Sequence, residues 1–358
     1  KLIQDIAGNI NLTQFKNLRY LTQNRAIATD NVIIRALPTF DPAFNSYKIA
    51  GSGYPFDLLN LSYITTGTPV YIIGTSKDLS WYFIVAPAMM GWVPAKNIAR
   101  VNSSFVNNWQ TFTNKALAGI LTSNLTIKDT NNNYQFTALV GTMLPVYKQY
   151  KNSFTLMIPV KNSAGQAIIK YTTITKKNAV LLPMPLTMEN FSNAIKYLIG
   201  KPYGWGGINF YNDCSLELIT IYKMFGIFLN RNSAAQASYS GQMIDVSGLP
   251  AEKRLEMVIR NGIPFATFLY LKGHIMIYIG TYNTAYGENT VMTYHNIWGL
   301  APEDRTWRDI IGGSVILPLL KEYPEVPQDI ALYNRDVFII TTLVQPNYNK
   351  IGLSNLLY

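Results

Sequence analysis

From Ala26 to Leu182 the chain is a series of short β-prone segments separated by turn residues. The segments are rich in Val, Ile, Tyr and Thr, and Gly, Pro, Asn or Asp stands at their ends. Examples are VIIR, TPVYIIG, SWYFIVA, SFTLMIPV and QAIIKYTTIT. Short strands at this spacing are typical of small barrels. The pattern therefore restricts this half of the chain to small all-β domains.

A faint internal repeat suggests that there are two such domains. Gly67–Tyr71 contains GTPVY, and Gly141–Tyr147 contains GT followed by PVY. The segment LLPMPL then forms a proline-stiffened linker. From Met188 onward apolar residues recur at helical spacing before β-prone runs return. This second half of the chain indicates an α+β domain, with helices packed on an antiparallel sheet.

The chain is therefore predicted to have an N-terminal segment, a first barrel, a second barrel, an α+β domain and a C-terminal extension. Their predicted limits are 1–25, 26–110, 111–185, 186–325 and 326–358. The N-terminal segment is expected to form one amphipathic helix that clasps another domain, because apolar residues recur at Leu12, Phe15, Leu18 and Leu21. The extension contains one β-prone run, VFIITTLV, and we expect it to lie over the surface with at most an edge strand.

The net charge of +10 calls for an anionic partner. Lys and Arg are scattered singly, without a basic block or a nucleic-acid reader motif, so we predict no nucleic-acid partner. An anionic cell-wall polymer or a membrane surface fits a diffuse positive charge. No apolar run of about 18 residues is present, so no span of a bilayer is expected. The chain begins at Lys1 without methionine, which is consistent with a removed export signal or a trimmed chain.

Cys214 is the only cysteine in the chain, so it can form neither an internal disulfide nor a thiolate-rich metal site. We predict no metal and no cofactor. Asn212 and Asp213 before it are good helix caps, and an apolar stripe at helical spacing follows it. Cys214 is therefore expected in the first turn of a helix, where free backbone N–H groups and the helix dipole favour a thiolate. The alternative is a buried packing residue, which is the commoner fate of a free cysteine.

A nucleophilic thiolate needs a base, and the chain contains only two histidines, His274 and His295. Each belongs to a β-prone run, HIMIYIG and NTVMTYH. On paired neighbouring strands the two side chains would lie close together. A cysteine at a helix start facing a histidine that another polar group orients is the papain-like arrangement for acyl transfer.

The chain from about Met188 to Leu320 resembles the NlpC family of papain-like cell-wall cysteine peptidases. The resemblance rests on PYGWGG, DCS with its helix, GIFLNRNSAAQA, GHIMIYIG and YHNIWG. GTPVYIIGTSKDLSWYFIVA with GWVPAKNI resembles a bacterial SH3-like domain. The fold class implied is multidomain: two small all-β SH3-like barrels, an α+β papain-like cysteine peptidase domain, and an N-terminal helical clasp that embraces the catalytic domain.

The resemblance also implies roles for individual residues. Cys214 matches the nucleophile, His274 the general base, His295 the polar group that orients the base, and Tyr203 a tyrosine near the oxyanion. One departure is Leu216, which stands where many family members have glycine.

Relatives that cut between D-glutamate and a diamino acid hold the short acyl side of the substrate with residues at the places of Asp213, Ser215, Asn232 and Ser233. Some of them have an aspartate where this chain has Asn232, and that carboxylate binds the free amino end of L-alanine. The first barrel of such relatives can present a tyrosine where this chain has Met89 and Met90. Asp57, on the long insertion of the first barrel, or Asp213 could take the place of these missing groups.

The resemblance implies a peptidoglycan hydrolase that cleaves stem peptides at the γ-D-glutamyl–diaminopimelate bond. One alternative is a transpeptidase or acyltransferase that passes the acyl group to an amine. Another is a non-catalytic cell-wall-binding protein, against which the Cys214, His274, His295 and Tyr203 set argues. We expect an exported monomer in the periplasm or cell envelope, with or without a lipid anchor.

Overall fold

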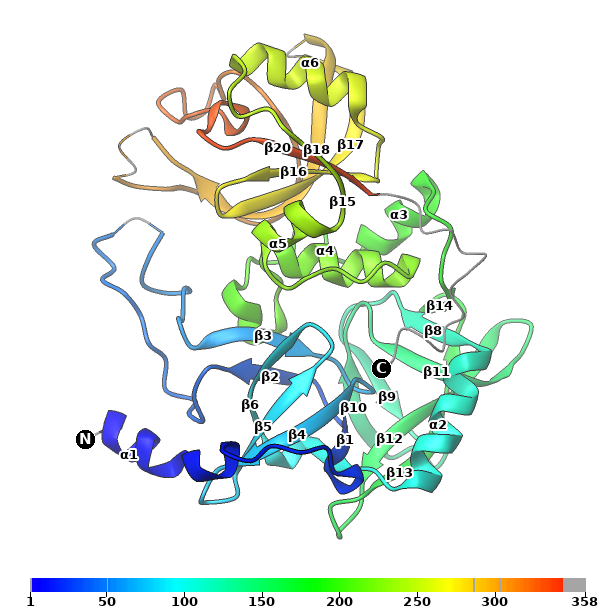
Figure 1. Ribbon diagram of the computed structural model, residues 1–358. Helices are drawn as coiled ribbons and strands as arrows, with labels where there is room; N and C mark the ends of the chain where they lie inside the picture. Colours follow the sequence, from blue (N-terminus) through cyan, green and yellow to red (C-terminus); the bar gives the residue numbers. More distant parts are fainter. Residues whose placement is uncertain (1, 50, 286, 303, 305, 344–358) are drawn as a thin grey trace.

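The computed structural model describes residues 2–49, 51–285, 287–302, 304 and 306–343. Figure 1 shows two β-rich regions in the lower half of the molecule, with helices and a further sheet above them. Within the described residues, no helix is long and apolar enough to cross a membrane. The arrangement is multidomain, as the sequence predicts.

The first β-rich region is one antiparallel sheet with strand order β3-β2-β6-β5-β4-β1-β7. Its strands are β1 Arg25–Ala28, β2 Val32–Arg35, β3 Asn60–Ile64, β4 Pro69–Thr75, β5 Trp81–Ala86, β6 Met89–Pro94 and β7 Ile98–Arg100, with a short turn η3 Ala95–Asn97. Burial alternates along β4, so every second side chain points into the barrel. The interior is filled by aliphatic residues such as Ile34, Ile84 and Val93.

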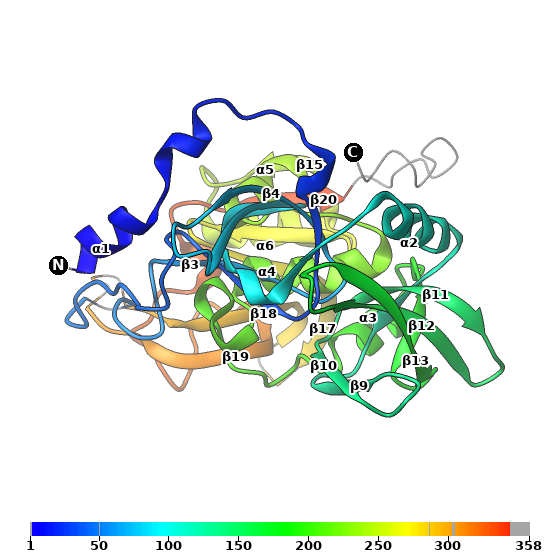
Figure 2. The ribbon, with the colours of Figure 1, turned by 90° about the horizontal axis from the view of Figure 1, so that it is seen from below.

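The second β-rich region contains a sheet of order β13-β12-β11-β8-β14 and a separate ribbon, β9-β10. Its strands are β8 Leu117–Ile120, β9 Leu125–Lys128, β10 Tyr134–Ala138, β11 Met143–Gln149, β12 Ser153–Lys161, β13 Ala167–Thr175 and β14 Ala179–Leu182. The two regions lie side by side in both views (Figures 1 and 2), and Asn31 of the first donates to the Thr137 carbonyl of the second. A second SH3-like barrel remains our prediction for this region.

A helix that the sequence analysis missed joins the two regions. It is α2 Ser103–Lys115, and its N-cap Asn102 accepts a hydrogen bond from the Phe105 backbone N–H. Phe105 stacks on Trp109 one turn later, with ring centroids 5.5 Å apart. The domain limit predicted at 110 falls inside this helix.

The N-terminal segment forms three short pieces instead of one amphipathic helix: α1 Leu2–Asn9, η1 Leu12–Phe15 and η2 Thr22–Asn24. Leu12 and Leu18 are largely exposed, at 69% and 56%, so the predicted stripe is wrong. The Phe15 ring packs on Phe83 and Trp92 of the first barrel, with centroids 5.6 and 6.4 Å away. Figure 2 shows the segment following the outside of that barrel. In the described residues it holds the first barrel, and the predicted clasp on the catalytic domain stays unconfirmed.

The upper part of the molecule is an antiparallel sheet of order β15-β20-β16-β17-β18-β19 with helices on both faces. The strands are β15 Gly241–Asp245, β16 Thr267–Leu271, β17 His274–Thr284, β18 Gly287–Leu300, β19 Asp309–Pro318 and β20 Ile339–Leu343. The helices are α3 Met188–Ile195, α4 Cys214–Tyr222, α5 Ser233–Tyr239 and α6 Ala251–Asn261. The side chains of Ile275 and Ile277 join the core with α3 and α4, whereas Met276 joins the core with α6. Figure 1 shows α3–α5 between this sheet and the two lower regions.

The C-terminal extension departs from its predicted place. Strand β20 lies inside the sheet, between β15 and β16, and Ile340 is fully buried. The predicted edge strand is therefore wrong, and residues beyond 325 belong to the α+β domain through this strand and η6 Leu332–Asn334. The rest of the predicted extension, 344–358, lies outside the described residues.

Candidate active site

Helix α4 begins at Cys214, as the sequence predicts. Asp213 caps it, because its Oδ1 accepts a hydrogen bond of 3.0 Å from the Leu216 backbone N–H. The helix continues through η5 Lys223–Phe225 and ends at Gly226, whose φ of 74° is the left-handed conformation that favours glycine at a helix end. The core-facing side chains of the helix hold Cys214 at a fixed place beside the sheet.

Cys214 is only 7% exposed, and its surroundings favour the neutral thiol. Burial raises the pKa of Cys214 to about 12, and the Asp213 carboxylate acts in the same direction. A hydrogen bond from the Ile275 backbone N–H and the Arg231 charge oppose this rise without reversing it. Desolvation is the largest of these effects, so this environment favours a resting thiol over the thiolate expected from the helix start. The Ile275 contact also places the start of β17 against the sulfur.

The two histidines meet, as predicted from their places on neighbouring strands. His274 is the first residue of β17, and its Nε2 lies 2.7 Å from Nδ1 of His295 on β18. Since Nε2 is engaged in this way, Nδ1 is the His274 nitrogen left for the cysteine. Burial lowers the pKa of His274 to about 4, and burial together with the His274 charge lowers the pKa of His295. Both rings are thus neutral near pH 7, and a neutral ring can accept a proton.

Tyr203 lies close to the nucleophile, and the first barrel covers it. Burial and the charges of Cys214 and Asp213 raise the pKa of the Tyr203 hydroxyl, so this group stays protonated and able to donate. Phe56, from the long β2–β3 loop, packs on the rings of Tyr203 and Trp298 with centroids 6.2 and 5.4 Å away. An aromatic wall from both domains therefore borders the site.

Asp213 and Ser215 come together around Arg231, a residue that the sequence analysis missed. Arg231 donates to both Asp213 carboxylate oxygens, at 2.5 and 3.1 Å, and to Ser215 Oγ at 2.8 Å. Its Nε also reaches Ser62 of the first barrel at 3.0 Å. The only sequence signal for this role was its position inside RNSAAQA, next to the predicted Asn232.

Asn232 and Ser233 lie at the start of α5, directly after Arg231. The Asn232 side chain is exposed and caps the helix by accepting from the Ala235 backbone N–H at 2.9 Å. The predicted place of Asp57 is wrong, because this residue is 2% exposed and forms a 2.5 Å ion pair with Arg35. Asp57 anchors the long loop of the first barrel and has no free carboxylate to offer a substrate.

No group of three or more His, Cys, Asp or Glu residues is arranged to hold a metal ion in the described part of the chain.

A second residue that the sequence analysis missed is Glu217, which is buried on α4 one turn after Cys214. Its charge gave no signal of its partners, which lie on β18, β19 and the loop before Cys214.

Comparison with known proteins agrees with this arrangement. Residues 42–94 match the family described as SH3 domain (SH3b1 type). The solved structure of a novel NlpC/P60 endopeptidase from Photobacterium damselae subsp. piscicida is 30% identical and has a TM-score of 0.84, over 96% of this chain and 78% of that one. An NlpC/P60 family protein from Bacillus cereus ATCC 10987 shares the fold, with 16% identity and a TM-score of 0.56 over 86% of this chain and 98% of that one. No curated protein sequence matches. With the cysteine, the histidine pair and this similarity in hand, we conclude that the chain belongs to the NlpC/P60 family.

Proposed function

We propose that this protein is a cysteine endopeptidase that hydrolyses the peptide stems of peptidoglycan. The observation that carries the proposal is the 2.7 Å contact between His274 and His295, together with the hydrogen bond from the backbone N–H of Ile275, the next residue, to the buried Cys214 at a helix start. A 30% identical relative is described as an endopeptidase, which supports the same class of reaction.

In the proposed reaction, Nδ1 of His274 accepts the proton of the Cys214 thiol while the sulfur attacks the carbonyl carbon of the scissile bond. The Cys214 backbone N–H and the Tyr203 hydroxyl bind the oxyanion. The C–N bond then breaks, His274 returns the proton to the leaving amine, and a thioester remains. Water attacks the thioester with His274 as base, which releases the acid and restores the thiol.

His295 orients the base in this scheme. Its Nδ1 accepts the Nε2 proton of His274, so that Nδ1 of His274 stays free for the cysteine. Because burial keeps both the thiol and the imidazoles neutral, charge separation between Cys214 and His274 accompanies substrate attack instead of preceding it.

We further propose the γ-D-glutamyl–diaminopimelate bond as the site of cleavage, with Asp213, Ser215, Asn232 and Ser233 on the acyl side. The Asp213 carboxylate is held by Arg231, so it offers little to a free ammonium group. The proposal therefore includes stems whose alanine is still joined to muramic acid. An exported monomer in the cell envelope, close to anionic polymer, is consistent with the net charge of +10.

The test is a digestion of purified peptidoglycan followed by mass spectrometry of the released muropeptides. The wild-type protein should release fragments with a new amino group on the diamino acid, and Cys214→Ala should release none while keeping the wild-type melting temperature. Fragments released equally by the alanine variant would show that the cysteine is not the nucleophile. Products in which an added amine is joined to D-glutamate would identify a transferase.

A further inference from the structure

Glu217 is a buried carboxylate one turn after Cys214, with 1% of its surface exposed. Its oxygens accept hydrogen bonds from the Tyr294 hydroxyl, from Ser314 Oγ at 2.8 Å and from Asn212 Nδ2 at 2.6 Å. No Lys or Arg forms an ion pair with it within the described ranges. Burying a carboxylate without a cation is costly and raises the pKa of Glu217, so these hydrogen bonds, and no ion pair, fix its position.

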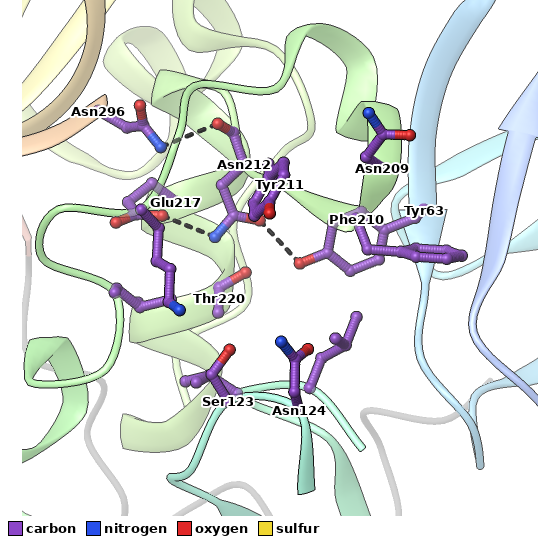
Figure 3. A pocket seen from close by; sticks show the side chains of 14 residues that line it. Tyr63, Ser123, Asn124, Asn209, Phe210, Tyr211, Asn212, Glu217, Thr220 and Asn296 are labelled. Carbon is purple, nitrogen blue, oxygen red and sulfur yellow. Dashed lines mark hydrogen bonds between the residues drawn. The ribbon is translucent and has the colours of Figure 1, made fainter. Parts of the chain in front are cut away.

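Asn212, two residues before Cys214, is the second centre of this network. Its carbonyl oxygen accepts from Asn296 Nδ2 at 2.9 Å, and its Oδ1 accepts from the Tyr63 hydroxyl at 2.7 Å (Figure 3). Tyr63 belongs to β3 of the first barrel. The loop before the nucleophile is therefore bonded both to the catalytic sheet and to the first barrel.

The two neighbours of His295 on β18 both donate hydrogen bonds to this network. Tyr294 reaches Glu217, and Asn296 reaches Asn212. Since Asn212 and Glu217 flank Cys214 along the chain, these two bonds fix the first turn of α4 against the part of β18 that carries His295. They connect the Cys214 helix to the strand of His295 without passing through His274.

Apolar packing holds the core-facing side of α4, but a cavity of about 130 Å³ lies beside the hydrogen-bonded network. Tyr63, Asn212, Glu217 and Asn296 line it, and Asn124 of the second β-rich region closes another side (Figure 3). Where side chains leave such a space, alignment depends on directional hydrogen bonds more than on interlocking shapes.

We propose that Glu217, Asn212 and Tyr63 are positioning residues that hold the Cys214 helix in register with the His295 strand. Through Tyr63, docking of the first barrel becomes a condition for activity. The role rests on the proposed function, since it acts through the same cysteine and histidines.

The mildest test is Tyr63→Phe, which removes one hydroxyl and leaves Asn212 Oδ1 facing a cavity that water can enter. We expect kcat on a stem peptide to fall about tenfold with KM nearly unchanged, the effect of one lost hydrogen bond on alignment. The matched control is Tyr323→Phe, because Tyr323 is also buried and its hydroxyl donates a part-buried hydrogen bond of 2.8 Å to the Pro318 carbonyl. Its kcat should stay at the wild-type value. Equal kcat in the wild type and both variants would overturn the proposal.

A second readout does not depend on peptidase activity. Cys214 is the only cysteine, so mass spectrometry can follow its alkylation by iodoacetamide at pH 7. We expect Asn212→Ala and His274→Gln each to slow alkylation about tenfold, because the first separates the thiol from its base and the second removes the base. The double variant should be no slower than His274→Gln alone.

Additive effects in the double variant would show that Asn212 does not act through His274, and a wild-type alkylation rate in Asn212→Ala would refute the positioning role. A wild-type protein that cuts no stem peptide while its alkylation still follows the expected order would reject the proposed function and leave the positioning role standing.

Discussion

The two β-rich regions hold the same helix, α4, in different ways. The first barrel reaches its catalytic end through neighbouring residues: Tyr63 donates to Asn212, just before the helix, and Ser62 accepts from Arg231, which also binds Asp213 and Ser215. The second region contacts the distal half through apolar packing, since Val140 is 3% exposed and belongs to the core cluster of the catalytic domain. Gly141 beside it lies against the Thr220 carbonyl and the Lys223 side chain.

This difference suggests a division of labour. Hydrogen bonds are directional and fix the orientation of a loop, whereas apolar burial is non-directional and contributes mainly to stability. We therefore expect changes at the first contact to lower activity more than stability. Changes at the second contact should do the reverse.

The largest expected effect comes from Gly206→Ala in η4 Trp205–Phe210, which packs on β3. Gly206 has a φ of 58°, and a Cβ there would lie 2.2 Å from the Asn60 carbonyl oxygen. Because the Gly206 N–H also donates to Asp213, a shift of this loop moves the cap of the Cys214 helix. We expect kcat/KM for a stem peptide to fall at least about a hundredfold.

Two glycines provide matched controls for that substitution. Gly200 also has a positive φ, 74°, but a Cβ there would meet nothing within 4 Å, so Gly200→Ala should cost about 1 kcal/mol and leave kcat unchanged. Gly141→Ala would place a Cβ 3.0 Å from the Thr220 carbonyl oxygen, at the second contact. It should lower the melting temperature more than kcat. A larger loss of kcat in Gly141→Ala than in Gly206→Ala would contradict the proposal that the first contact serves activity and the second serves stability.

The next effect is on stability: its dependence on pH should distinguish the catalytic domain from the two β-rich regions. His274 and His295 are the only histidines in the chain, and the pKa of His274 is lowered from 6.5 to about 4 in the folded protein. Below pH 6.5 the unfolded chain therefore binds a proton that the folded chain does not. The free energy of unfolding should fall between about pH 6.5 and pH 4, by up to about 3 kcal/mol for this group.

Urea denaturation at several pH values measures this slope, and the histidine-free variant His274→Gln/His295→Gln is its control. Asp78 and Asp129 in the two β-rich regions titrate lower, because hydrogen bonds from Ser76 and Lys170 hold their pKa at about 2. The variant should lose most of the slope in this window. An unchanged slope would show that other groups determine the acid sensitivity.

The catalytic elements were predictable because their signals are local in sequence. Asp213 precedes Cys214 as a helix cap, and each histidine belongs to a β-prone run, so a helix start facing paired strands followed from short stretches. Helix α2 was missed because its Ser, Asn and Thr residues are weak helix formers, and packing of Phe105 on Trp109 supports it instead.

The remaining features depend on contacts between distant residues. A short β-prone run such as β20 looks the same at the edge and inside a sheet, so only its pairing with β15 and β16 decides its place. Glu217 lies 77 residues from Tyr294, and Asp57, in the β2–β3 loop, pairs with Arg35 of β2. Their sequence neighbours gave no indication of these partners, which is why Asp57 was assigned to the substrate.

The smallest expected effect concerns the amino end of the substrate, for which the sequence left Asp57 of the first barrel and Asp213 as candidate carboxylates. Both candidate carboxylates are engaged, Asp57 by Arg35 and Asp213 by Arg231, and exposed Asn232 is neutral. We therefore expect a free tetrapeptide and the matching disaccharide-tetrapeptide to be cut with kcat/KM values within about tenfold of each other. Asn232→Asp should shift the ratio toward the free peptide about tenfold, since aspartate caps α5 equally well and adds the missing charge.

The control for this shift is Asn102→Asp, the same exchange at the N-cap of α2, which is part of the barrel region and not of the catalytic site. The ratio of kcat/KM for the two substrates should be the same in Asn102→Asp as in the wild type. A changed ratio in Asn232→Asp then reports the charge added next to the active site. A preference of the wild-type protein for the free peptide of a hundredfold or more, roughly 2.7 kcal/mol in transition-state binding, would show that another group neutralises the ammonium. In that case the Asp213–Arg231 pair would have to open on substrate binding, because Asp213 is the carboxylate nearest to the nucleophile along the chain.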